Sequence, residues 1–84
     1  TALTRLECSW NDLSNLDVSQ NTALTELECA DNKLSKLDVS QNTALTGLYC
    51  RGNKLSSLDL TNNKNLDNLR YDYDTVTVIG WEDE

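Results

Sequence analysis

The sequence contains no histidine, and none of its three cysteines lies close to another, as the cysteines of a CxxC motif do. The usual His and Cys patterns of zinc and redox sites are therefore missing. Long apolar runs are also missing, because no segment approaches the roughly 20 consecutive apolar residues of a transmembrane helix. No charged and then apolar leader opens the chain, and we expect no membrane insertion.

Basic side chains are scarce as well. The 7 Lys and Arg residues stand against 14 Asp and Glu residues, which gives a formal net charge of −7. Nucleic acids and anionic membrane surfaces bind patches of Lys and Arg. We therefore expect neither as a partner, and we attribute the acidity to solubility.

What the chain does have is a repeat of 21 residues. The segment 22–42 reads TALTELECADNKLSKLDVSQN, and it recurs with local edits in 1–21 and in 43–63. The segment 64–84 keeps part of the same apolar pattern. The period predicts one solenoid domain over 1–84, made of three regular repeats and a degenerate C-terminal capping repeat.

Each regular repeat reads L-x-x-L-x-C-x-x-N-x-L, which resembles the leucine-rich repeat signature. Alternation of apolar and polar residues before each cysteine, and before Tyr71 in the last segment, predicts short strands at 4–8, 25–29, 46–50 and 67–71. Because a full coil connects each strand to the next, the strands must be parallel neighbours, and we expect this sheet on the concave face. The returning half of each repeat has no helix-length apolar stripe. We expect an extended or irregular convex side with little or no α-helix.

The cysteines follow the repeat, since Cys8, Cys29 and Cys50 are 21 residues apart. Stacked coils would place them in one column at about 4.8 Å intervals. A disulfide is barely within reach at that separation, and an odd number cannot all pair. Parallel side chains in one row cannot converge tetrahedrally on a metal. We interpret the column as a ladder of buried free thiols, and we predict neither a metal site nor a cofactor.

Two polar residues also recur in each regular repeat. We expect the first, an Asn after the strand, to be buried and to bond the backbone at the bend. We expect the second, an Asp two residues before a Ser or Thr, to accept a local Asx-type hydrogen bond, and a weak calcium site along this column is the alternative. These residues are Asn11, Asn32, Asn53 and Asp17, Asp38, Asp59.

The two ends of the chain differ. In the last repeat Tyr71 replaces the cysteine, and Val76, Ile79 and Trp81 fall where Leu13, Leu16 and Val18 lie in the first repeat. We expect Tyr71 and Trp81 to cover the last coil, with ligand contact as the alternative. The first repeat is as regular as the second, so its leucines have no cap. We expect a fragment of a longer array that is able to self-associate through this uncapped N-terminal coil.

Edits between the repeats gather on the outward side of the strands. The first two repeats differ at five positions, and most of these lie on or just after the strand. Trp, Tyr and Arg are the residue types enriched at interface hot spots, so this face is the candidate recognition surface. Cross-strand pairing of Arg5 with Glu26 and of Arg51 with Asp72 is the structural alternative. The candidate partner-binding residues are Arg5, Glu7, Trp10, Glu28, Tyr49, Arg51, Arg70 and Tyr73.

Without its variable positions, the repeat at 22–42 reads T-A-L-T-x-L-x-C-x-x-N-K-L-S-x-L-D-V-S-x-N. This pattern resembles the repeats of bacterial surface proteins of the internalin family. The resemblance implies a curved right-handed solenoid, an extracellular or cell-surface location, and protein binding on the concave face in adhesion. The helical N-terminal cap of the family and a cell-wall anchoring signal are not found in the sequence.

We therefore predict a protein-binding module of the adhesion type. A passive stalk, or a C-terminal cap that supports another domain, is the alternative. We do not predict an enzyme, although Glu7 and Glu28 would lie one strand apart as the two carboxylates of a glycosidase do. They would lie on an open, solvated face where nothing raises one pKa above the other.

Overall fold

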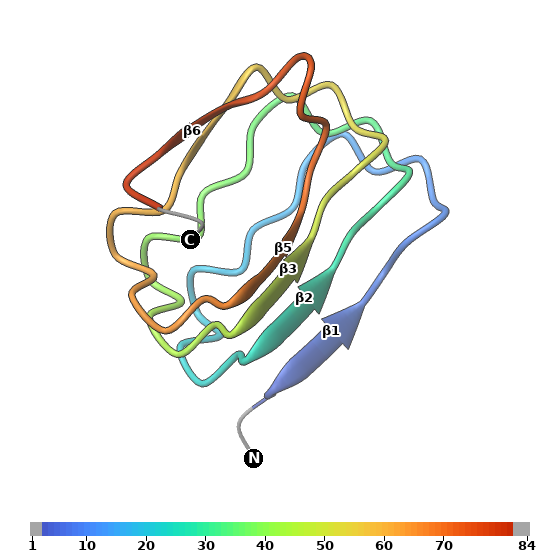
Figure 1. Cartoon of the computed structure of the whole chain (residues 1–84). Helices are drawn as coiled ribbons and strands as arrows, with labels where there is room; N and C mark the ends of the chain where they lie inside the picture. Colours follow the sequence, from blue (N-terminus) through green and yellow to red (C-terminus); the bar gives the residue numbers. More distant parts are fainter. Residues whose placement is uncertain (1–2, 82–84) are drawn as a thin grey trace.

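The structure, a computed structural model, describes residues 3–81. The chain winds through successive coils, and each coil passes the same side of the molecule once (Figure 1). The strands are short, and no helix occurs within the described range. They are β1 (Arg5–Glu7), β2 (Glu26–Glu28), β3 (Gly47–Tyr49), β4 (Ser57–Asp59), β5 (Asn68–Arg70) and β6 (Thr77–Ile79).

Four of the strands form one parallel sheet in the order β1-β2-β3-β5. The register follows the repeat, so that Leu6, Leu27, Leu48 and Leu69 are direct neighbours across the sheet. The strands predicted from the sequence are confirmed at their centres, and each is one residue shorter at either end. The parallel solenoid without helices is therefore confirmed.

A second, two-stranded sheet was not predicted. It joins β4 to β6 on the opposite side of the coils from the larger sheet (Figure 1). Leu58 pairs with Val78, which is one residue fewer than the repeat period, because a tight turn from Asp72 to Val76 shortens the last coil. The expectation that Ile79 would take the inward position of Leu16 is wrong. Val78 packs against the core, and the Ile79 side chain is 49% exposed.

The core is a stack of leucines and valines between the two sides of the coils. Inward residues of the second and third repeats, such as Leu27 and Leu48, are completely buried. In the first repeat Leu6 and Leu13 are only partly buried, and Leu3 is 42% exposed. In the last coil Leu66 and Leu69 are buried, and Tyr71 and Trp81 pack against the core there. Burial is therefore incomplete only where a coil has neither a neighbour nor a cap on one side, as expected for a solenoid whose repeats contact only their neighbours.

Asparagine amides connect one coil to the next. Asn32 donates from Nδ2 to the Cys29 carbonyl at 3.1 Å and to the Cys8 carbonyl of the preceding coil at 3.0 Å. Its Oδ1 accepts from the Leu13 backbone N–H at 3.1 Å. Asn11 and Asn53 also bond backbone carbonyls, so the predicted backbone bonding in the three regular repeats is confirmed. The expected burial is wrong for Asn11, which is exposed because no described coil precedes it, and Asn53 is half-buried. A second ladder, which the sequence analysis missed, consists of Asn42 and Asn63, whose amides each bond two carbonyls of the preceding coil.

The aspartate column on the returning side makes the predicted local hydrogen bonds. The carboxylate of Asp17 accepts from the Ser19 backbone N–H at 3.0 Å, and Asp38 and Asp59 repeat this contact with Ser40 and Thr61. The hydroxyl and the backbone N–H of that residue lower the pKa of each carboxyl group below its ordinary value. Within residues 3–81, no group of three or more His, Cys, Asp or Glu side chains is arranged to hold a metal ion.

The first prediction concerns the core. Leu27→Ala removes a completely buried side chain between two coils. We expect the free energy of unfolding to fall by about 2–5 kcal/mol, from lost burial and from the cavity left behind. Urea or thermal unfolding measures it. Leu3→Ala, at an exposed position of the same repeat pattern, is the control and should cost far less. Equal effects of the two substitutions would contradict the burial gradient.

The second prediction concerns the open edge of β1, which has a strand neighbour on one side only within the described residues. Unpaired backbone groups and partly exposed leucines at such an edge favour association between copies. We expect the mean mass of the 84-residue chain in sedimentation to rise with concentration. Leu3→Lys should reduce the rise by placing a charge at the edge. A mass that stays monomeric at every concentration would show that this edge does not self-associate.

Candidate functional site

The outward side of the sheet β1-β2-β3-β5, called the strand face below, carries two rows of side chains. The register aligns the first row as Arg5, Glu26, Gly47 and Asn68. It aligns the second row as Glu7, Glu28, Tyr49 and Arg70. Four of the predicted site residues therefore form one row across the sheet. The polarity changes along it, from carboxylates on β1 and β2 to Tyr49 and Arg70 on β3 and β5.

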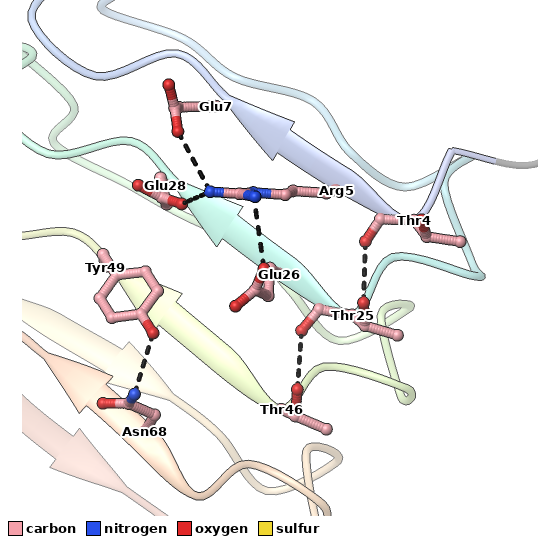
Figure 2. Close-up of polar contacts among 9 residues, drawn as sticks. All are labelled: Thr4, Arg5, Glu7, Thr25, Glu26, Glu28, Thr46, Tyr49 and Asn68. Carbon is pink, nitrogen blue, oxygen red and sulfur yellow. Dashed lines mark hydrogen bonds and ion pairs between the residues drawn. The ribbon is translucent and has the colours of Figure 1, made fainter.

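At the acidic end, one guanidinium holds three carboxylates (Figure 2). Arg5 contacts Glu28 at 2.9 Å, Glu7 at 3.3 Å and Glu26 at 3.5 Å. The hydrogen bond and the charge of Glu28 raise the pKa of Arg5 above its ordinary value. The predicted pairing of Arg5 with Glu26 is confirmed, as part of a larger cluster. Because the cluster is exposed, its ion pairs contribute little to stability.

Tyr49 is fixed by two neighbours in the first row. Gly47 has no side chain, and a Cβ there would lie 3.2 Å from the Tyr49 hydroxyl and 3.4 Å from its ring. The ring therefore lies back over Gly47, which it buries. On the other side, Asn68 donates from Nδ2 to the Tyr49 hydroxyl oxygen at 2.9 Å (Figure 2). Gly47 and Asn68 were not among the predicted site residues. The sequence did carry a signal for Gly47, since glycine stands there in place of Arg5 and Glu26 of the first two repeats.

A shallow hollow of about 470 Å³ lies beside Tyr49. Gly52 is one of its lining residues, and a side chain there would collide with the carboxylate of Asp31 in the preceding coil. The Asp72 carboxylate accepts from the Gly52 backbone N–H at 3.0 and 3.2 Å. The hollow is lined by Ala30, Asp31, Tyr49, Arg51, Gly52, Arg70 and Asp72.

Two arginines line this hollow, Arg51 and Arg70. Arg51 was expected to pair with Asp72, and this is wrong, because Asp72 instead bonds the Gly52 backbone. Within residues 3–81, neither Arg51 nor Arg70 makes an ion pair. This distinguishes them from Arg5, whose charge is already shared by three carboxylates.

The remaining predicted residues lie at the border of the strand face. Tyr73 is 63% exposed, and its ring packs edge-to-face with the ring of Tyr71 at a centroid distance of 4.5 Å. Tyr73 also lines a second hollow, together with Arg51. Trp10 lies in the turn after β1 and is 80% exposed. The structure thus brings Tyr49, Arg51 and Arg70 together around one hollow with Tyr73 beside it.

The three cysteines lie behind this face as free thiols. Cys29 and Cys50 are buried, and Cys8 in the first coil is partly exposed. Burial raises the pKa of all three thiols, and in Cys50 burial together with the charge of Asp72 raises it to about 12. Since the thiolate is the reactive form, Cys29 and Cys50 are inert side chains of the core.

The comparison with solved structures finds a clear similarity over most of the chain. The chain is similar to a structure described as the functional domain of InlJ from Listeria monocytogenes, which includes a cysteine ladder. The identity is 41% over 83% of this chain, and the TM-score is 0.81. This chain is an internalin-like leucine-rich repeat. No protein-family model and no curated protein sequence matches it.

The likeness to InlJ confirms the resemblance to the internalin family that the sequence indicated. The chain spans 16% of the length of the InlJ structure, so it corresponds to a few coils of a longer domain there. Within the described residues, no helix is long and apolar enough to cross a membrane. The similarity to part of InlJ shows that the chain is a module of stacked leucine-rich repeats. Its strand face is the candidate binding site.

The third prediction concerns the thiols. At pH 8 the raised pKa values keep the thiolate fraction small, so we expect slow reaction of the native protein with an aromatic disulfide reagent. Cys8 should react first because it is the least buried, and urea should release all three thiols. Cys8→Ser should remove the fast phase, whereas Cys50→Ser should leave it unchanged. Equal reactivity of the three thiols in the native protein would contradict the burial seen in the structure.

Proposed function

We propose that this chain is a protein-binding module of the adhesion type, belonging to a secreted or cell-surface bacterial protein. Its binding site is the C-terminal half of the strand face, where Tyr49, Arg51, Arg70 and Tyr73 gather. The observation that carries the proposal is a pair of arginines that make no ion pair within residues 3–81 and lie beside a fixed tyrosine at an open hollow. The ligand is an acidic segment of another protein.

The chemistry of arginine supports an acidic ligand. A guanidinium presents several N–H donors in a rigid plane that matches a carboxylate, and such charge-assisted pairs are strong and directional. Arg70 lies opposite Tyr49 on the next strand, and Arg51 follows Tyr49 by two residues along the chain. The two arginines therefore lie diagonally across the hollow. A carboxylate entering the hollow would meet both. Asp31 and Asp72 at the rim would repel carboxylates that are not aligned with the arginines.

The geometry of the sheet supports recognition of a preformed shape. Tyr49 is held by Asn68, and the strand beneath it is held by the core, so binding orders few new groups. Tyrosine and arginine in this arrangement are the side chains that most often dominate binding energy. The likeness to a domain of InlJ fits a surface module of this kind.

The same face gives no support to catalysis. Glu7 and Glu28, the pair of carboxylates one strand apart, both contact the guanidinium of Arg5. Neither is left in an apolar pocket that would hold a proton for general acid chemistry. The function we propose is therefore binding alone.

A passive stalk remains the second candidate, and the asparagine ladders favour it. Buried amides that bond each coil to the preceding one would make the solenoid a stiff spacer. A stalk, however, needs no unpaired arginines on one face. The two functions differ in a simple way, because only the binding module has a saturable ligand.

The fourth prediction tests the binding module. A displayed peptide library is selected on the immobilised chain, and the affinity of the selected peptides is measured in solution. We expect peptides rich in Asp and Glu. Replacement of Tyr49 and Arg51 by Ala together should weaken their binding by at least about 2 kcal/mol, the range of hot-spot residues.

Two controls lie on the returning side of the coils. Lys36→Ala removes one positive charge, as Arg51→Ala does, and Asp38→Ala removes one negative charge. Both should leave affinity nearly unchanged. Equal loss with Lys36→Ala would mean that net charge alone drives binding. Failure to select any saturable peptide would favour the stalk.

A further inference from the structure

Trp10 has an unusual backbone. It adopts a φ of 64°, in the left-handed region, and the equivalent residues of the next two repeats do the same, Asp31 at 58° and Gly52 at 77°. The turn after each strand therefore requires this conformation in each of the three regular repeats. Glycine adopts it freely and aspartate tolerates it, whereas for a bulky residue it is an outlier that carries strain.

Burial of the Trp10 side chain does not compensate for this strain. Its side chain is 80% exposed, so the indole buries little apolar surface. Trp81, by contrast, packs against the core and donates from its indole nitrogen to the Leu66 carbonyl at 3.0 Å. Strained residues that have no packing role are typical of functional sites.

The surroundings of Trp10 are acidic. Its backbone N–H donates to the Ala30 carbonyl at 2.9 Å, which places the turn directly beside Asp31. The two strands that lead into these turns end in Glu7 and Glu28. Arg5 pairs with three carboxylates at this end of the strand face, and Lys33 contacts Asp12, two residues from Trp10, at 3.9 Å. Five carboxylates, those of Glu7, Glu26, Glu28, Asp12 and Asp31, thus lie in this region with two cations. Negative charge is therefore in excess around the exposed indole.

We propose that Trp10 is a docking anchor for a lysine or arginine side chain of a partner protein. The face of an indole attracts a cation more strongly than any other side-chain ring, and nearby carboxylates add to the attraction. The proposal deepens the proposed function and rests on it for the idea that the strand face binds protein. It adds that the partner is dipolar, with a basic group at Trp10 and an acidic group at Arg51.

The separation of the two groups follows from the repeat. Trp10 and Gly52, the neighbour of Arg51, occupy the same position two coils apart. At the usual strand spacing this is about 10 Å. A short peptide that carries Lys at one end and Glu at the other spans this distance, and one that carries two like charges does not satisfy both ends.

The fifth prediction uses a charge-neutral substitution. Trp10→Gly relieves the strained backbone and should raise the melting temperature by about 4–8 °C. The same substitution should weaken binding of a labelled, lysine-containing glycine peptide about two- to fivefold, the range of an exposed cation–π contact. Trimethyllysine in the peptide should preserve the difference between wild type and variant, and neutral norleucine should abolish it.

The controls separate this proposal from the preceding one. Arg51→Ala leaves the turn of Trp10 untouched and should not weaken binding of the lysine peptide. Unchanged lysine-peptide affinity in Trp10→Gly would overturn the proposal, because net charge alone would then explain the binding. A lower melting temperature would overturn it by revealing a packing role. Loss of a dimer in sedimentation would overturn it by making Trp10 a contact between copies.

Discussion

The structure depends on stacking of equivalent coils at one fixed register. Leu6, Leu27, Leu48 and Leu69 are neighbours across the sheet, and the two inner ones, Leu27 and Leu48, are each covered by the coil before and the coil after. Asparagine amides bond the same coils along their edges. Because every contact of the core is a contact between neighbours, burial is complete in the middle of the stack and incomplete in the first coil.

This constraint leaves the outward positions free to differ. Above the leucine column lies the row Glu7, Glu28, Tyr49 and Arg70, in which charge changes sign within four strands. The scaffold permits such changes because an exposed side chain on a strand contributes little to the core. The turn after the strand is an exception, since its left-handed backbone penalises Trp10 and favours Gly52. The conformational strain of a residue therefore depends on its position in the coil, and Trp10 is a bulky outward residue at a strained position.

Much of this arrangement could be read from the period. The parallel strands, the inward leucines and the backbone bonding of Asn32 and Asp38 recur through the three regular repeats, so one copy predicts the others. Features that occur in only one coil could not be predicted from the period. The β4–β6 sheet depends on a tight turn that shortens the last coil, and the pattern of the earlier repeats does not contain it. The expected pair of Arg51 and Asp72 failed because Asp72 found a backbone donor at Gly52.

The sequence by itself determined the direction, order and register of the main sheet, because a period of 21 residues leaves one way to stack identical apolar positions. Only the tertiary structure decided which charges meet. It placed Arg5 among three carboxylates, left Arg51 and Arg70 without an ion pair to any residue in 3–81, and formed a hollow beside Tyr49. These outcomes depend on how side chains from different coils orient toward one another, and no local pattern in the sequence encodes that orientation.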